Sequence, residues 1–262
     1  MVPNTGTSEG RPYLLAETNW KAVRETDFQV AVLPWGATEA HNYHLPYATD
    51  NYQVEHVAAG AAAMAWERGA RVIVLPCIPF GVNTGQLDID LCMNMRPQTQ
   101  LAILRDVGDV LQRAGVDKLV ILNGHGGNNF KTMIRELSVD FPELFVCWVN
   151  WYQVVDWKEY FEDPGDHAGE METSAMLYIR PGLLRPLEEA GPGQARRPVI
   201  KAMKEGWVTT QRPWTEVTDD TGVGSPYEAS AKKGARYLAA CAEGLAGFFV
   251  DLAETGRGEL YR

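Results

Sequence analysis

The sequence predicts one α/β domain whose mostly parallel sheet is covered by helices on both faces. Three apolar runs, at 28–36, 70–81 and 117–127, end in proline or glycine, as buried parallel strands often do. Segments with helical spacing separate these runs, so strands and helices alternate along the chain. The length of 262 residues and the hydrophobic content of 45% suit a single domain spanning 1–262.

The elements follow one another in a regular order. Helices are expected at 51–69 and 99–115, because both segments have helical spacing and close at a glycine. A helix at 130–139 and a strand at 144–151 extend the same alternation. The pattern therefore indicates a doubly wound sheet.

The ends of the chain and one internal stretch need separate treatment. Residues 225–256 have helical spacing, with Ser225 as a plausible N-cap and Pro226 in the first turn. The stretch 185–198, rich in proline, glycine and charge, is interpreted as a surface excursion within the domain. Residues 1–12 are expected to form a flexible N-terminus.

Composition excludes several classes of protein. A formal net charge of −10 and a pI near 5 argue against nucleic acid as a partner, because phosphate binding needs clustered Lys and Arg. Neither a signal peptide nor a membrane span is predicted, so we expect a cytoplasmic protein. The four cysteines are scattered and are interpreted as reduced packing residues.

Residues 39–50, "EAHNYHLPYATD", concentrate metal-binding side chains just after the first predicted strand. Glu39 and His41 are two apart in extended chain, so both project to the same side. His44 is a candidate for supporting a ligand by hydrogen bonding. Asp50 begins the next helix, where it is either a ligand or the N-cap of an Asp-x-x-Gln capping box.

Two further clusters follow later in the chain. His125 lies in "NGHGGNN", directly after a predicted strand, in a loop whose glycines allow close approach of the backbone to a ligand. The stretch 166–174, "DHAGEMETS", contains Asp166, His167, Glu170 and Glu172. Each acid there has an ordinary alternative role as an N-cap or as a first-turn partner of the helix dipole.

Convergence favours a metal site over unrelated caps. Loops at the carboxyl ends of parallel strands share one rim, where ligands bind. If Glu39, Asp50 and Glu170 all ligate, their charge overloads one divalent ion but leaves room for a hydroxide between two. Mixed imidazole and carboxylate ligands suit Zn or Mn, with Fe as a further candidate. We therefore predict two divalent ions per chain.

Three motifs together resemble the creatininase (creatinine amidohydrolase) family. They are Glu-x-His-x-x-His-Leu-Pro from Glu39, Asn-Gly-His-Gly-Gly-Asn at 123–128, and His-Ala-Gly-Glu-x-Glu-Thr-Ser at 167–174. The resemblance extends over roughly residues 13–252. It implies a single-domain three-layer α/β/α sandwich, a binuclear metal site, hydrolysis of a non-peptide or unusual amide C–N bond, and a homohexamer built as a trimer of dimers.

The resemblance also implies a ligand arrangement. One ion is held by Glu39 and His125, and the other by His41 and a glutamate, with Asp50 bridging the two. Members that hydrolyse creatinine carry a glutamate where this chain has Gly127. The glutamate of the second ion is therefore assigned to Glu170, with Glu172 as the alternative.

Two departures from the family pattern bear on the substrate. The stretch "DPGDH" replaces the Glu-His and nearby tryptophan of creatinine-hydrolysing members, so creatinine is disfavoured. The loop 80–99 lacks the usual Phe-Pro-Gly-Thr pattern and is expected to form an active-site wall particular to this chain. The expected substrate is a small molecule with an amide, formamide or cyclic amide bond.

The expected mechanism uses metal-activated water and one free imidazole. Water held between two divalent ions has its pKa lowered from about 15.7 towards roughly 7. His167, paired with its neighbour Asp166, is the candidate acid that protonates the leaving nitrogen. Glu172 either supports a ligand or complements the helix dipole.

Two alternatives from other classes remain. A mononuclear Fe(II) oxygenase would need two histidines and one carboxylate, and the surplus of acids argues against it. A non-catalytic protein that uses the fold for assembly would have a damaged ligand set, whereas every ligand type is present here.

Overall fold

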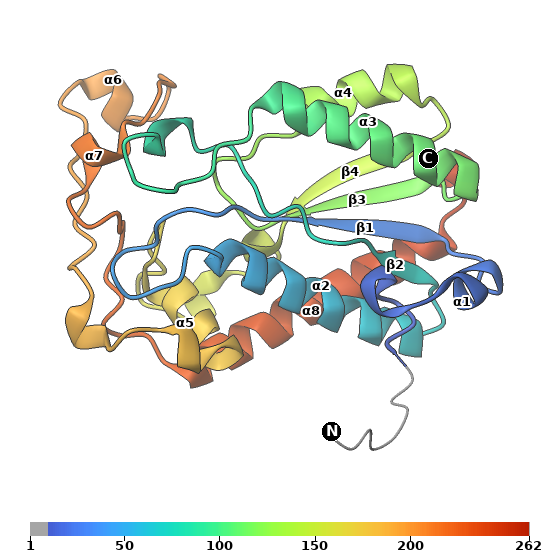
Figure 1. The fold of residues 1–262 in the computed structure, drawn as a ribbon, viewed down its shortest axis with the longest axis horizontal. Helices are drawn as coiled ribbons and strands as arrows, with labels where there is room; N and C mark the ends of the chain where they lie inside the picture. Colours follow the sequence, from blue (N-terminus) through green and yellow to red (C-terminus); the bar gives the residue numbers. More distant parts are fainter. Residues whose placement is uncertain (1–9, 262) are drawn as a thin grey trace, which may run out of the picture.

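The computed structural model describes residues 10–261, which contain a four-stranded parallel sheet (Figure 1). The strand order is β2-β1-β3-β4, as the alternation of strands and helices predicts. The strands are β1 (Val30–Trp35), β2 (Val72–Val74), β3 (Lys118–Asn123) and β4 (Phe145–Asn150).

Two of the predicted strands are shorter than expected. β2 ends at Val74 instead of extending through 70–81, and Pro76 and Pro79, which have no N–H to donate to a ladder, lie in the missing part. β3 ends at Asn123, so the glycines of "NGHGG" form a loop at the rim of the sheet.

Helices cover both faces of the sheet and complete three layers (Figure 1). On one face lie α2 (Thr49–Glu67), α5 (Glu170–Ile179) and α8 (Ala231–Glu254). On the other face lie α3 (Pro97–Ala114) and α4 (Lys131–Asp140). The predicted three-layer α/β/α architecture is therefore confirmed.

Side chains alternate between two cores along β1. Val30 and Val32 pack in the core beneath α2 and α8, whereas Ala31, Leu33 and Trp35 pack in the core beneath α3 and α4. This alternation follows from the two-residue period of a strand. Because β1 is buried on both faces, it is a rigid base for the loop that follows it.

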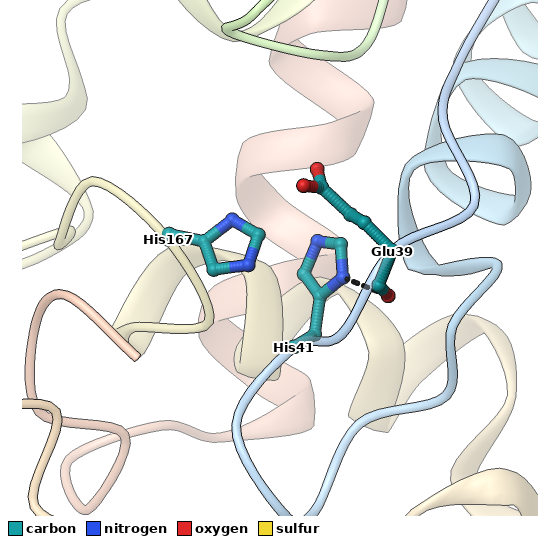
Figure 2. A group of neighbouring side chains, drawn as sticks. All are labelled: Glu39, His41 and His167. Atoms are coloured by element: carbon teal, nitrogen blue, oxygen red, sulfur yellow. Dashed lines mark hydrogen bonds between the residues drawn. The ribbon is translucent and has the colours of Figure 1, made fainter. Parts of the chain in front are cut away.

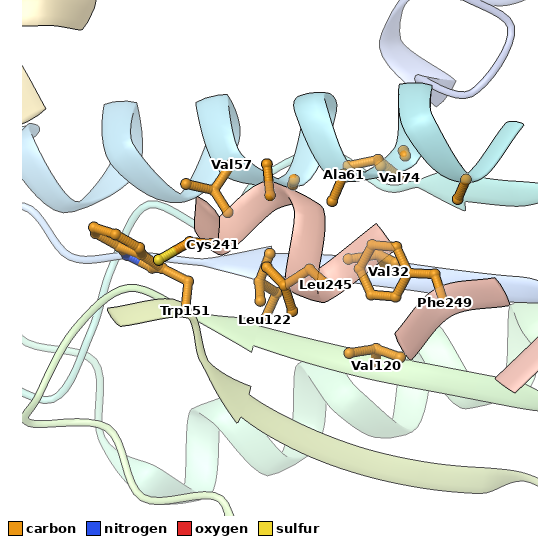
Figure 3. Packing of buried hydrophobic residues seen from close by; sticks show 14 of the residues in the cluster. Val32, Val57, Ala61, Val74, Val120, Leu122, Trp151, Cys241, Leu245 and Phe249 are labelled. Carbon is orange, nitrogen blue, oxygen red and sulfur yellow. The ribbon is translucent and has the colours of Figure 1, made fainter. Parts of the chain in front are cut away.

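Small residues let α2 and α8 lie close together over the sheet. Ala58, Ala61 and Ala62 of α2 are fully buried, and a Cβ at Gly60 would lie 3.4 Å from Ala242 of α8. Figure 3 shows Val57 and Ala61 of α2 near Leu245 and Phe249 of α8, above strand residues. This packing fixes the N-terminal turn of α2, which carries Asp50.

The final helix begins later than the sequence predicts. The N-cap is Ser230, whose Oγ accepts a hydrogen bond from the backbone N–H of Lys233. Ser225 and Pro226 precede a turn, so the expected N-cap at Ser225 is wrong. The serine nearest the helical pattern provides the capping hydroxyl.

The remaining helices are short. α6 and α7 lie together at one end of the molecule, in a largely irregular region between α5 and α8 (Figure 1). Residues 1–9 of the expected flexible N-terminus lie outside the described residues, and Arg11 forms an ion pair with Glu17. No helix of residues 10–261 is long and apolar enough to span a bilayer. The short elements are α1 (Trp20–Arg24), α6 (Lys201–Lys204), α7 (Trp214–Val217) and 3-10 turns at Leu15–Glu17, Thr84–Gln86, Trp151–Gln153, Trp157–Glu159, Pro181–Leu183, Leu187–Glu189 and Arg257–Glu259.

Candidate active site

Buried acids and histidines from four segments meet at the carboxyl ends of β1 and β3. His125 Nδ1 lies 2.7 Å from Glu39 Oε1 and 3.2 Å from Asp50 Oδ2. His41 Nε2 lies 3.0 Å from Asp50 Oδ1 and 3.8 Å from Glu172 Oε2. Asp50 therefore stands between the two histidines, with one carboxylate oxygen facing each.

Backbone carbonyls orient all three histidines of the site. His41 Nδ1 lies 3.1 Å from the Glu39 carbonyl, a contact drawn in Figure 2. His125 Nε2 lies 3.1 Å from the Val82 carbonyl, and His167 Nε2 lies 2.7 Å from the Ala40 carbonyl. Since a carbonyl only accepts, each of these nitrogens carries the proton and the other ring nitrogen is left for a ligand.

The carboxylates have too few hydrogen-bond donors around them. Glu39 Oε2 accepts from the Gln86 side-chain amide, and Glu172 Oε2 accepts from the backbone N–H of Ala168 at 2.5 Å. Glu39 Oε1 and Asp50 Oδ2 are buried, and within residues 10–261 a single basic nitrogen, His125 Nδ1, faces both of them. Buried anionic oxygens of this kind require a cation, so these residues fit a metal site.

Electrostatic coupling shifts the pKa values of the cluster. Burial opposes the charged form of His41, but Asp50, Glu172 and Glu39 raise its pKa to about 10. Burial also opposes the charged form of His125. Glu39 and Asp50 outweigh this effect and raise the pKa of His125 well above its usual value. Burial acts to raise the pKa of Asp50, but the two histidines lower it. Without another cation, protons on the histidines balance these carboxylates.

Among residues 10–261, three sets of three ligand atoms lie close enough to hold an ion. In each set the atoms lie within 4.8 Å of one another. Two of the sets share Asp50, which is the arrangement expected of a bridging carboxylate. The sets are Glu39, Asp50 and His125; His41, Asp50 and Glu172; and Glu39, His41 and His167.

The position of Asp50 decides between its two predicted roles, metal ligand and helix N-cap. α2 begins at Thr49 with Ala48 as its N-cap, and no side chain caps the helix. Asp50 lies in the first turn and directs its carboxylate at His41 and His125. The capping-box interpretation of Asp50 is therefore wrong. Asp50 is an acid in the first turn of the helix, and its carboxylate does not cap the helix.

The structure separates Glu170 from the cluster and brings in Glu172 instead. Glu170 forms an ion pair with Lys233 of α8 and accepts from the backbone N–H of Asp163. Residues two apart in a helix project about 200° from one another, so only one of the two glutamates can face the cluster. The assignment of Glu170 as a ligand is wrong because Lys233 occupies its face.

His167 lies in the site, but Asp166 does not orient it. The His167 ring lies 4.1 Å from the His41 ring and 5.2 Å from Trp214, centroid to centroid. The Asp166 carboxylate accepts from Arg212 at 2.6 Å and is largely exposed. The expected Asp166–His167 pair is therefore wrong, because the Asp166 carboxylate pairs with Arg212 and His167 Nε2 contacts the Ala40 carbonyl.

His44 supports the loop without joining the cluster. Its Nε2 lies 2.8 Å from Thr173 Oγ1 of α5, and the side chain is buried. Burial lowers its pKa to about 4, so the ring is neutral at neutral pH. It therefore connects the loop after β1 to the helix that carries Glu172.

A cavity of about 420 Å³ opens onto the cluster. Its floor includes Glu39, Asp50 and His125, and one wall is the stretch Val82–Gln86 within the loop that the sequence predicts to be an active-site wall. A second wall, residues 210–214, was not predicted. That stretch, "TQRPW", has no periodicity and no acid or histidine that would have indicated a site.

Gly127 explains why the second glutamate comes from α5. A Cβ at this position would lie 2.4 Å from His125 Nε2 and 2.4 Å from the Val82 carbonyl. A glutamate there would displace the loop that holds His125. In this chain the glutamate beside His41 is Glu172, and Asp50 is the second carboxylate there.

Comparison with known proteins shows the family of this chain. Residues 16–249 match the family model Creatininase, described as creatinine amidohydrolase. A structure of a candidate creatinine amidohydrolase from Bacteroides fragilis superposes with a TM-score of 0.89 at 43% identity, covering 96% of this chain and 99% of that one.

Two curated relatives have different activities in their names. A mycofactocin precursor peptide peptidase of Mycobacterium ulcerans is 26% identical over 217 residues, 79% of each chain. A 2-amino-5-formylamino-6-ribosylaminopyrimidin-4(3H)-one 5'-monophosphate deformylase of Methanothermobacter thermautotrophicus is 27% identical over 191 residues, 68% of this chain and 72% of the relative. Because the family model matches residues 16–249, most of its length, the chain belongs to the creatininase family.

Proposed function

We propose that this protein is a metal-dependent amidohydrolase that cleaves a non-peptide C–N bond of a small molecule. One observation carries the proposal: two acid and histidine sets share Asp50 at the floor of one cavity. Each set offers three protein ligands, the number typical of catalytic sites that keep a position open. The structure thus supports two ions per chain.

The donor set favours particular metals. Glu39, Asp50 and His125 would hold one ion, and His41, Asp50 and Glu172 the other. Carboxylates with imidazoles suit Zn or Mn, and no thiolate lies in the sets among the described residues. When bound, such ions lower the pKa of water towards about 7 and polarise an amide carbonyl.

The protein's own residues orient ligands and carry protons. The carbonyls of Glu39 and Val82 keep His41 Nε2 and His125 Nδ1 directed at the carboxylates. His167 keeps its proton on Nε2 against the Ala40 carbonyl, which leaves Nδ1 to take up a proton and deliver it to the leaving nitrogen. Trp214, packed edge-on against His167, shields that ring from bulk water.

Cavity size and relatives support a small amide as substrate. A volume of about 420 Å³ lies in the range of small-molecule sites. The curated relatives include a peptidase and a deformylase, both of which by name act on C–N bonds. On the family resemblance we also propose a cytoplasmic homohexamer.

One observation favours a second candidate function. Glu39, His41 and His167 have the composition of the 2-His-1-carboxylate site of mononuclear Fe(II) oxygenases. In such a site His41 and Glu39 would bind the same iron. In the two-ion arrangement, Glu39 would bind one ion and His41 the other. One iron per chain together with substrate-dependent consumption of O₂ would support this candidate over hydrolysis.

Metal analysis of purified protein tests the ligand set. We expect about two divalent ions per chain in the wild type, about one in Glu172→Gln, and almost none in Asp50→Ala. Glu170→Gln is the matched control, because Glu170 lies in the same helical turn as Glu172 but pairs with Lys233. Loss of an ion from the control and not from Glu172→Gln would contradict the assignment, and two ions in Asp50→Ala would refute the bridging role.

A further inference from the structure

Arg212 is the one lysine or arginine among the described residues that line the active-site cavity. The other charged groups lining it are carboxylates and histidines. Its side chain is 44% exposed, so the guanidinium remains open to solvent and to a ligand. This places one permanent positive charge at the mouth of a cavity whose floor is acidic.

Three contacts hold Arg212 at that position. The guanidinium carbon lies 4.5 Å from the centre of the Trp214 ring, and Nη1 donates to Asp166 Oδ2 at 2.6 Å. A Cβ at Gly85 would lie 2.2 Å from the Arg212 carbonyl, so the main chain is pressed against the opposite wall. The guanidinium is therefore oriented before any ligand arrives.

Arg212 is linked to the acid and histidine cluster by a short series of ring contacts. Trp214 packs against His167 at 5.2 Å, and His167 stacks on His41 at 4.1 Å. Arg212 also lines the same cavity as Asp50 and His125, so one molecule in that cavity would contact both ends.

Most donors of Arg212 remain unused. A guanidinium has five N–H groups. Within residues 10–261, only the donation from Nη1 to Asp166 engages this one. Asp166 occupies one edge of the plane, and the donors of Nε and Nη2 remain for a planar, bidentate acceptor.

The charge of the surrounding segment points in the same direction. Residues 195–212 contain five Lys or Arg and a single acid, Glu205, although the whole chain has a formal charge of −10. Arg196 pairs with Asp219 and Lys201 with Glu205, so Arg197 and Lys204 supply the remaining positive charge of the segment, which raises the local concentration of anions. Arg212 is the member of this basic segment that reaches the cavity.

We propose that Arg212 anchors an anionic group of the substrate, a carboxylate or a phosphate, while the scissile amide lies over the Asp50 cluster. This inference rests on the proposed function and narrows its substrate class to anionic amides. Arg212 is then the residue that determines specificity at the mouth. Trp214 and the packing of the Arg212 main chain at Gly85 keep the guanidinium in place, whereas Asp166 competes with the ligand for one of its donors.

Calorimetric titration of the metal-loaded protein tests the proposal without a known substrate. The probes are glutarate and 3-phosphonopropionate, which carry an anion at each end, and butyrate, which carries one. The variants are Arg212→Met, Arg212→Lys and Asp166→Asn. Arg197→Met is the matched control, because Arg197 is exposed on the same basic segment and does not line the cavity.

We expect the wild type to bind one or both two-ended probes more tightly than butyrate. Arg212→Met should weaken that binding by on the order of 10- to 100-fold, as for a charge-assisted hydrogen bond, and leave butyrate unchanged. Arg212→Lys should fall between the two, and Arg197→Met should match the wild type. The probe that shows the Arg212-dependent gain identifies the anion as carboxylate or phosphate.

The Asp166→Asn variant separates anchoring from a purely structural pair. If Arg212 only fastens two loops through Asp166, both variants lose affinity equally, and the proposal is overturned. If Arg212 is the anchor, Asp166→Asn binds the two-ended probes at least as well as the wild type. If Arg212→Met and the wild type bind the two-ended probes equally well, the proposal is also overturned. Failure of the proposed function would be seen separately: the protein would contain no metal, and its affinity for butyrate would not change when metal is added.

Discussion

The two halves of the candidate site differ in burial and in how they are held. The half built on the loops after β1 and β3 has side-chain exposures of 0% for Glu39 and His41, 2% for Asp50 and 8% for His125. In the half built from irregular segments, Asp166 is 61% exposed and Arg212 is 44% exposed. The first half is a buried cluster on a rigid sheet, and the second is an open wall.

This difference separates two tasks. Buried carboxylates with backbone-anchored histidines need no further adjustment to hold ions, because their geometry is set before a ligand arrives. The exposed side chains of the wall can vary in sequence with little effect on the cluster, since the wall reaches His41 through the buried rings of Trp214 and His167. The buried half is thus suited to hold ions, and the open wall is suited to contact a substrate.

The largest expected effect concerns His167, where the two halves meet. His167→Asn should lower kcat by about 10²–10⁴-fold on whichever amide the wild type hydrolyses, because the proton donor to the leaving nitrogen is lost. Metal content should stay at the wild-type level, and an amide with a better leaving group should recover much of the rate. If the variant loses an ion, His167 belongs to the buried half as a ligand.

The next effect tests the rigidity of the buried half. Gly127→Ala should disturb the His125 loop, because the new Cβ would lie 2.4 Å from the Val82 carbonyl. We expect a loss of about 1–3 kcal/mol in stability, measured by denaturant unfolding, together with weaker metal binding. Gly126→Ala is the control, since its Cβ would meet only the Tyr152 hydroxyl at 3.9 Å. Equal tolerance of both substitutions would show that the loop can adjust.

A smaller effect on metal affinity is expected where Gln86, in the loop 80–99, supports the proposed metal ligand Glu39. Gln86→Leu removes the amide that donates to Glu39 Oε2 and should weaken metal affinity by about 10- to 100-fold. Gln211→Leu, in the opposite wall and bonded only to its neighbour Thr210 in the described structure, should leave affinity unchanged. Competition with a chelator measures both. Similar losses in the two variants would contradict the division between the halves.

Sequence reasoning succeeded where the sheet determines position. Glu39, His41 and His125 each follow a buried strand by a few residues, and parallel strands bring such positions to one rim. Asp50 was assigned to the same rim because it begins the helix after β1. The four side chains indeed meet, at distances of 2.7–3.2 Å between His125 or His41 and the acids.

Sequence reasoning failed where packing between distant segments decides. Glu170 and Glu172 are equivalent in the motif, and only the position of Lys233 on α8 distinguishes their faces. Asp166 was paired with its neighbour in sequence, but its partner is Arg212, 46 residues away. Long-range contacts between irregular loops leave no periodic signal in the chain.

By itself, then, the sequence determined the order of strands and helices, the parallel sheet and four residues that meet at its rim, Glu39, His41, Asp50 and His125. These follow from local periodicity and from the rule that consecutive parallel strands end on the same edge. Only the tertiary structure decided which glutamate faces His41, what holds each imidazole, and that Arg212 and Trp214 form the outer wall. These features depend on the positions of α8 and of residues 210–214, which are set by the packing of side chains far apart in the chain.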